Sequence, residues 1–390
     1  MITNLKKISI LLLAGFACVF SAPLTSNAQA QNPTSNSIFF KAEIVQVANT
    51  QEEIAEDGTK TYIQTIELKG LEKPWKDQLI TVSNSEFNTL GPKSYQKGDV
   101  MLMVDNKDDS GKDHFVIVDF VRETPLYFLG FIFVALVALI GKKKGLKALF
   151  SLFLSFLVII YFMVPQIAGG SDPVLISAIG AIFITILTLY LTYGFTYFSH
   201  LGAISVIASL LITVIMSQFF SDLTKLTGKA EESVTYLTQL LGPNFNARGL
   251  LLAGFIIGAL GILDDVIINQ LSLIEELHKA DKNLSSFELF KRGLKVGVDH
   301  ISAIVNTLFL AYTGASLPLL LLFVADKSVQ YSFTSVINME IITTEIVRTL
   351  TGSIGIVLSV PISTFFAAIF IPMFFKKGHE LAHKHHTHVK

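Results

Sequence analysis

The chain has 390 residues, of which 51% are hydrophobic and only 16% are charged. This balance indicates a protein with many membrane-spanning helices and excludes an ordinary soluble domain. The formal net charge of −1 provides no excess of basic residues, so no nucleic acid is expected among the partners.

The first 30 residues have the pattern of a secretory signal peptide. Lys6 and Lys7 precede a short apolar run at 8–20, and Ala28-Gln29-Ala30 has the small residues of a cleavage site. The sequence leaves open whether this segment is removed or kept as an anchor. Its removal would take away Cys18, the only cysteine, and a chain without cysteine forms no disulfides.

Residues 31–123 form a second region that is charged, rich in turn residues and β-prone. Turn signals such as Glu56-Asp57-Gly58 and Lys97-Gly98-Asp99 separate short runs that alternate apolar and polar residues. This pattern predicts a small, OB-like all-β domain outside the cytoplasm, acting as a passive module rather than a ligand site. The predicted strands are Phe39–Val47, Thr61–Leu68, Gln78–Val82, Val100–Val104 and His114–Val121.

Residues 124–375 form a transmembrane helical domain. Seven apolar segments in it are long enough to span a bilayer. An amphipathic cytoplasmic helix is expected at 271–298, where apolar residues recur among charges. The predicted spans are 124–141, 148–165, 173–194, 202–220, 249–269, 301–323 and 347–374.

Basic residues orient these spans. With the β-domain outside, the predicted cytoplasmic loops and tail hold thirteen Lys and Arg residues, and the outer loops between spans hold four. Because cytoplasmic loops are enriched in Lys and Arg, the asymmetry places the C-terminus inside. The expected location is a bacterial cell membrane, with the lipid bilayer as the first partner.

The most informative stretch runs from Gly254 to Gln270, an apolar helix that ends in two adjacent acids. Gly254, Gly258, Gly261 and Asp265 share one helix face, and small residues at this spacing let a neighbouring helix approach. Asp265 is therefore predicted to point into a helix bundle, with Asp264 more exposed. An acid at such a position costs several kcal/mol unless it has a partner or a task. The alternative is that both acids simply face water.

Further polar residues divide into two groups by depth in the membrane. Because a helix rises 1.5 Å per residue, Arg248 and Asp264 lie about 24 Å apart. Acid, imidazole and carboxamide groups at one depth suit proton relay or cation coordination, and the imidazole titrates near neutral pH. The predicted ion-coupling set is Asp264, Asp265, Gln270, Asp299, His300 and Asn306, and the predicted outer gate is Arg248, Glu345 and Arg348. The alternatives are a structural Glu345–Arg348 pair and an interhelical hydrogen bond for Asn306.

Residues 376–390 form a histidine-rich cytoplasmic tail. His379 and His383 stand in an H-E-x-x-H pattern, which is the zinc-binding pattern of metalloproteases. A tail with this many histidines produces such a match by composition, so a peptidase is not predicted and no enzyme activity or cofactor is expected. Transition-metal binding at His379 and His383 remains as an alternative.

The chain resembles the YibE/F-like family of bacterial multi-pass membrane proteins, and the resemblance covers nearly all of residues 39–375. It implies an envelope protein with a β-domain followed by spans, and it leaves the activity open. The matching motifs are the run from Asn246 to Val266, Asp299-His300, Asn306-Thr307, Ala311-Tyr312, and the run from Glu345 to Gly355.

A second resemblance concerns mechanism. The order of a glycine-rich span ending in Asp-Asp-Val, an Ile-Glu-Glu-Leu amphipathic helix and a returning span is similar to the membrane half of RND and SecD/SecF-type proteins. This similarity covers residues 249–375 and implies intramembrane acids that use a proton gradient. The second half that those transporters possess is missing from it.

Two functions are therefore carried forward. The first is a proton- or cation-coupled transporter or export-assisting permease for an ion or small molecule. The second is a non-transporting envelope module that senses or assembles partners, or copies of itself, through its β-domain. A polar path between the fifth and sixth spans would favour transport, and an exposed apolar patch on the β-domain would favour assembly.

Overall fold

The computed structural model describes residues 38–54, 60–83, 95–107, 113–325 and 332–387. The predicted signal peptide lies outside these residues. Contacts divide the chain into two compact units, with the boundary between Ile140 and Gly141.

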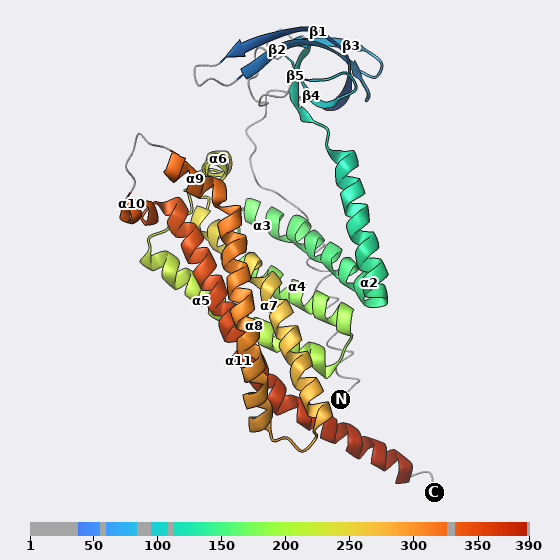
Figure 1. Cartoon of the computed structure of the whole chain (residues 1–390), viewed down its shortest axis with the longest axis vertical. Coiled ribbons are helices and arrows are strands. Elements are labelled where there is room, and N and C mark those ends of the chain that lie inside the picture. Colours follow the sequence, from blue (N-terminus) through green and yellow to red (C-terminus); the bar gives the residue numbers. More distant parts are fainter. Residues whose placement is uncertain (1–37, 55–59, 84–94, 108–112, 326–331, 388–390) are drawn as a thin grey trace. The chain divides into compact units, whose positions relative to one another are not determined.

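Five strands form one antiparallel sheet in the first unit, in the order β3-β2-β1-β4-β5. The long β1 pairs with β2 and with β4, and the sheet curls into a half-barrel (Figure 1). Register shifts in β1 add to the curl, because bulges increase local twist. All five predicted strands are present, which confirms the small β-domain. They are β1 (Ile38–Ile54), β2 (Lys60–Gly70), β3 (Leu79–Ser83), β4 (Val100–Lys107) and β5 (Asp113–Phe120).

The core of the β-domain follows from alternation along β1. Phe40 and Ile44 are buried while Phe39 is exposed, because successive side chains point to opposite faces of a strand. On the buried face the ring of Phe40 packs on Trp75 and Phe115, with centroid distances of 4.4 and 5.8 Å. This aromatic cluster closes the inside of the curled sheet.

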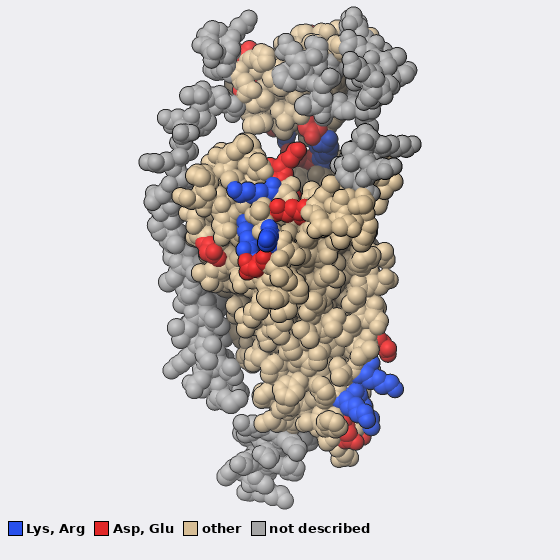
Figure 2. Space-filling model, turned by 90° about the vertical axis from the view of Figure 1, so that its left-hand side faces the viewer, with Lys and Arg blue, Asp and Glu red and all other residues tan. Residues whose placement is uncertain are grey.

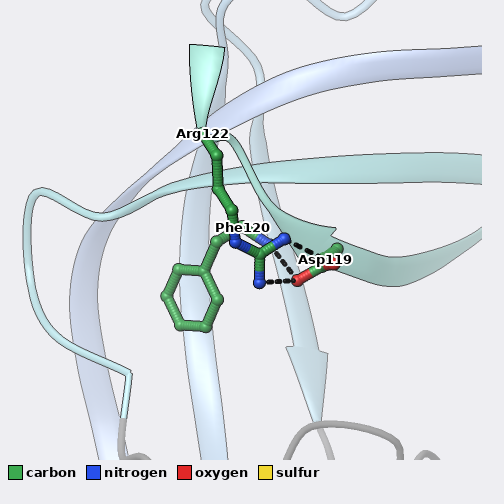
Figure 3. A network of polar contacts seen from close by, with 3 residues as sticks. All are labelled: Asp119, Phe120 and Arg122. Atoms are coloured by element: carbon green, nitrogen blue, oxygen red, sulfur yellow. Dashed lines mark hydrogen bonds and ion pairs between the residues drawn. The ribbon is translucent and has the colours of Figure 1, made fainter. Parts of the chain in front are cut away.

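Ionic contacts fix the junction between the sheet and the first helix, α2 (Glu123–Val158). Two nitrogens of Arg122 donate to the two carboxylate oxygens of Asp119 at 2.7 and 2.8 Å, and the Phe120 N–H donates to the same group (Figure 3). The Arg122 guanidinium, aided by that N–H, lowers the pKa of Asp119. Lys41 on β1 donates to Glu123 at 2.7 Å, and this hydrogen bond raises the pKa of Lys41.

The described residues contain six helices that are long and apolar enough to cross a membrane, where the sequence predicted seven spans. The first two predicted spans fall within one helical stretch of 46 residues. It consists of α2, a π-helical turn η2 (Ile159–Met163) and α3 (Val164–Ala168). The two segments are separated only by a backbone break at Lys142, with φ 49° and ψ −134°. The stretch is therefore two helices that meet at a kink, so the count of six joins the first two predicted spans into one.

The remaining long helices pack into a bundle, and α7 contacts all the others. Its side chains at Leu263, Ile267, Leu271 and Ile274 are completely buried. The bundle consists of α4 (Pro173–Tyr193), α5 (Tyr197–Leu223), α7 (Ala247–Ala280), α8 (Ser286–Ala315) and α11 (Glu340–Thr387). With the family resemblance and six membrane-length helices, the polytopic helical fold is confirmed.

The predicted amphipathic helix at 271–298 is wrong as a separate element. Its first part continues α7 to Ala280, and its second part begins α8. The break between them comes from Ser285, which forms a reciprocal capping box with Glu288 and so starts a new helix.

Hydroxyl-bearing residues line the contact between α5 and α11. A Cβ atom on Gly355 would overlap the Thr213 hydroxyl, so the two helices approach closely at this level. Ser217 donates to the Thr351 hydroxyl at 3.2 Å across the same contact. Thr213 and Ser217 belong to a stripe of hydroxyl residues on α5 that are all buried and recur every fourth position: Ser205, Ser209, Thr213, Ser217 and Ser221.

Short helices gather at the end of the bundle where α7 begins, called here the Arg248 end (Figure 1). They are α6 (Glu232–Leu241), α9 (Leu317–Ala325) and α10 (Phe333–Ile337). On the face shown in Figure 2, charged side chains of the helical unit lie towards its two ends, with a broad uncharged band between them. This distribution is typical of a protein whose middle is surrounded by lipid.

Candidate functional site

The acid that the bundle partly buries is Asp264, not Asp265. The Oδ1 atom of Asp264 is buried and has no hydrogen-bond partner among the described residues. Asp265 is exposed. The prediction that Asp265 is the buried acid is therefore wrong, because the packed face of α7 is the one that carries Leu260, Leu263 and Ile267. Asp264 borders that face.

The glycine face of α7 is open within the single chain. No side chain of a neighbouring helix lies within 4 Å of a Cβ placed on Gly254 or Gly261, and the nearest atom to one on Gly258 is the Tyr312 hydroxyl at 3.7 Å. All three glycines are exposed. The expectation that this face packs against a neighbouring helix of the same chain is therefore wrong. The name "open face" is used below for Gly254, Gly258, Gly261 and Asp265.

Gln270 ties three helices together one and a half turns beyond Asp264. Its amide nitrogen donates to the Gly293 carbonyl on α8 at 2.9 Å and to the Thr364 hydroxyl on α11 at 2.8 Å. Gln270 is only 2% exposed. A carboxamide engaged in this way holds helices together, and its predicted role in ion coupling gains no support from these contacts.

The α8 members of the predicted ion-coupling set stand apart from Asp264. Asp299 and Asn306 are exposed and His300 is partly buried. In the part of the chain that the structure describes, no hydrogen bond or ion pair joins any of them to Asp264. Asn306 forms no interhelical hydrogen bond there either, so the structural alternative for it is not met.

A different histidine lies in the bundle where α4 is followed by α5. His200 at the start of α5 forms a hydrogen bond with the Tyr190 hydroxyl at the end of α4, and the next tyrosine of α4, Tyr193, is close enough to Asp265 for the two groups to interact electrostatically. Sequence analysis did not select these residues. The signal was a Tyr-x-x-Tyr-Gly turn followed by a histidine between two apolar segments.

The charges of the predicted outer gate are paired at the Arg248 end. Arg348 donates to Glu345 at 2.7 Å one turn away on α11, and its guanidinium lies 5.2 Å from the centre of the Phe255 ring on α7. Arg248 forms an ion pair with Asp222 of α5 at 2.6 Å. The three predicted residues therefore belong to two separate ion pairs, and Asp222 is a partner that sequence analysis missed.

A cavity of about 310 Å³ lies at the same end, between α6, α7 and α11. Leu250 and Leu251 form part of its apolar wall, and its polar lining includes Arg348, Thr344 and Glu231. A neighbouring loop is held in place by Glu340, which accepts hydrogen bonds from the N–H groups of Thr227 and Gly228. Gly228 also lines the cavity, so this loop forms part of a fixed boundary.

The predicted metal ligands His379 and His383 lie on the last turns of α11, where the side chains are outside the described part. Metal binding there stays a prediction. Among the residues that the structure does describe, no group of three or more His, Cys, Asp or Glu side chains has the geometry to hold a metal ion.

Comparison with known proteins gives one match. The family model described as YibE/F-like protein matches residues 129–373, which is more than half of the chain. No curated protein and no solved structure matches. The matched region contains Asp264, the paired charges of the Arg248 end and the cavity. The similarity to RND and SecD/SecF-type proteins stays a prediction. The chain is a multi-pass membrane protein and belongs to the YibE/F-like family.

Proposed function

We propose that this protein is a permease that couples the movement of a proton or cation to the transport of a small solute, and that Asp264 is the coupling acid. The observation that supports this is the carboxyl of Asp264, whose Oδ1 atom is buried without a hydrogen-bond partner in the described bundle. Transport here is a binding and conformational process, and no catalysed reaction is part of it.

The physical reason is the cost of an ionised carboxylate inside a membrane. An unpaired charge at such a position costs about 3 kcal/mol or more, so the group takes up a proton or holds a cation. A group that alternates between these states and a charged, water-exposed state converts an ion gradient into a conformational preference. Asp299 and His300 form no hydrogen bond or ion pair with Asp264 in the described part of the chain, and so the coupling role is assigned to Asp264 alone.

The experiment is uptake into proteoliposomes with and without an imposed pH gradient, over a panel of inorganic ions and small solutes. Asp264→Asn keeps the size and hydrogen-bonding capacity of the side chain but cannot ionise. We expect gradient-dependent uptake by the native protein and a loss of at least about tenfold in Asp264→Asn, because mutation of a group that must carry the coupled charge removes the driving step.

Asp265→Asn is the matched control. It removes the same charge one residue away, from a side chain that is exposed, and we expect it to keep most of the uptake. Full gradient-dependent uptake by Asp264→Asn at the same protein abundance would exclude coupling through this acid. Absence of a gradient effect for every solute with the native protein would count against the permease altogether.

We also propose that the protein lies in a bacterial cell membrane with the β-domain outside and the C-terminus inside. The thirteen-to-four distribution of basic residues supports this orientation. Reporter fusions at Lys144, Lys229 and the C-terminus are expected to report inside, outside and inside. An external C-terminus would contradict the orientation.

A second candidate function, the assembly of envelope partners, is favoured by one observation. The open face leaves Gly258, Gly261 and Asp265 exposed on the outside of the bundle, where lipid would otherwise meet a carboxylate, while Gly254 borders the cavity at the Arg248 end. Gly258→Leu adds a bulky side chain to this face and would prevent a partner helix from approaching closely. A complex in mild detergent that Gly258→Leu dissociates would support assembly, and equal size distributions for native protein and variant would count against it.

A further inference from the structure

The cavity at the Arg248 end has the general character of a small-molecule site. Its walls include aliphatic side chains from α6 and α7, such as Val234, Leu237, Leu250 and Leu251. Ligand sites are typically concave and mostly apolar, with a few polar groups that fix orientation. At about 310 Å³ the cavity falls at the small end of the range for such sites, which suits a solute the size of an amino acid.

The cationic member of the lining is Arg348. One guanidinium nitrogen bonds Glu345, and the other two nitrogens have no hydrogen-bond partner among the described residues. A guanidinium presents its donors in a planar fork that matches a carboxylate. Packing of Arg348 over the Phe255 ring holds the group in place. Arg348 therefore has a fixed position and free donors on the cavity wall.

The anionic member is Glu231, which precedes the first residue of α6. Its Oε2 atom accepts only a long hydrogen bond from Ser233, at 3.4 Å, and it forms no ion pair with a described residue. Glu231 lies at the N-terminal end of α6 and Arg348 lies on α11, and both line the cavity. The lining thus has one unpaired carboxylate, one guanidinium with free donors, and apolar surface.

We propose that this cavity binds a zwitterionic solute with an aliphatic portion, such as an amino acid or a short peptide. Arg348 binds the carboxylate, Glu231 binds the ammonium group, and the leucine and valine side chains contact the aliphatic part. This site deepens the permease function and would supply its substrate class. Binding itself is measured without any gradient or transport.

The experiment is calorimetric titration of the full-length protein in nanodiscs with four probes. L-Leucine and glycyl-L-leucine are the zwitterions, 4-methylpentanoate has only the carboxylate, and 3-methylbutylamine has only the amine. We expect at least one zwitterion to bind, and each single-charge probe to bind about tenfold or more weakly, because each lacks one charge-assisted hydrogen bond.

Two variants assign the contacts. Glu231→Gln is expected to weaken zwitterion binding about tenfold and to leave 4-methylpentanoate unaffected. Because Glu231 is exposed, this change does not threaten folding. Arg348→Gln is expected to weaken the zwitterion and the carboxylate alike. Glu232→Gln is the matched control, since it removes the same charge from the neighbouring residue, which does not line the cavity.

Several outcomes would overturn the zwitterion site. They are no binding of either zwitterion, equal binding of 4-methylpentanoate and leucine, or equal effects of Glu231→Gln and Glu232→Gln. Asp264→Asn separates the two proposals. Leucine binding that persists in this variant while coupled uptake is lost supports both proposals. Zwitterion binding without any coupled uptake in the native protein contradicts only the permease. Coupled uptake without zwitterion binding contradicts only this site.

Discussion

Two faces of the same helix, α7, differ in how closely neighbouring helices cover them. One side packs against α4, α5 and α11, and Leu263 and Ile267 on it are completely buried. The other side carries Gly254 and Gly261, and a Cβ placed on either would meet no neighbouring side chain within 4 Å. Glycine is thus abundant where the single chain leaves α7 uncovered.

This difference shows what a pattern of small residues indicates and what it does not. Spacing of glycines shows that a helix face is flat and can be approached closely. It does not show that the approaching helix belongs to the same chain. On α11 the glycine at 355 meets Thr213 of α5 directly, whereas a Cβ on Gly254, Gly258 or Gly261 of α7 would meet nothing closer than 3.7 Å. The following substitutions compare the packed and the open positions.

The largest effect is expected for Gly355→Val. The valine side chain would overlap Thr213 and force α5 and α11 apart, and overpacking of a close contact costs about 1 to 3 kcal/mol, occasionally more. Gly261→Val on the open face is the matched control and is expected to keep native stability. The measurement is the thermal midpoint in mild detergent. Equal midpoints for both variants would show that the α5–α11 contact is looser than the structure indicates.

A smaller effect is expected for Gln270→Leu. It removes two hydrogen bonds that join α7 to α8 and α11, and interhelical hydrogen bonds in membranes contribute about 0.6 to 1.7 kcal/mol each. Asn269→Leu changes the neighbouring exposed residue and is expected to be neutral. A destabilised Asn269→Leu with a native-like Gln270→Leu would reverse the assignment of packed and open sides.

Charge removal sharpens the same contrast. Glu345→Gln leaves Arg348 without its partner at a partly buried position, and a loss of about 1 kcal/mol is expected. Asp264→Asn removes a charge that has no partner, so equal or greater stability is expected. Chemical denaturation of the two variants side by side tests this. A loss in Asp264→Asn larger than that in Glu345→Gln would indicate a bound cation or a partner for Asp264.

The smallest effect concerns an acid that faces water and is paired, in contrast to Asp264. The pKa of Asp119 is lowered by Arg122 and the Phe120 N–H. The stabilisation of the fold by the Asp119–Arg122 pair is therefore fully present above the ordinary carboxyl pKa of 3.8. It is lost as the pH falls through the lower pKa of the folded state. Hydrogen exchange of the peptide around Phe120 is expected to differ between native protein and Asp119→Asn at pH 6, and the difference is expected to shrink as the pH falls below 3.8. Equal exchange in the two proteins at pH 6 would contradict the pairing.

Local patterns predicted most of the fold. Alternation along β1, as at Phe40 and Ile44, placed the strands, because one face of a curled sheet must be buried. Apolar length located the helices. The first two predicted spans meet at the kink at Lys142 with no loop between them, and the helix at 271–298 was misplaced because the Ser285 capping box starts α8. Both depend on backbone geometry over a few residues.

The candidate site was less predictable. The acid pair on α7 could be identified because a carboxylate is energetically costly inside a membrane. The choice of Asp265 over Asp264 relied on the expectation that the glycine face of α7 is packed. Which side of a helix is covered depends on helices far away in sequence, here α5 and α11. A usable signal was overlooked. Hydroxyl residues recur every fourth position from Ser205 to Ser221, and Thr213 and Ser217 of that stripe meet α11.

The bridge at Gln270 has a mechanical consequence. Gly293 and Gly297 allow α8 to lie directly against Gln270 and its neighbours, and beyond them the only fully buried residue of α8 towards Ala315 is Leu308 among those described. We therefore expect α8 to be held firmly where it contacts Gln270 and less firmly along the rest of its length. Rotation of α8 about its contact with Gln270 would change the distance between α8 and the glycines of α7 without moving the contact between α5 and α11.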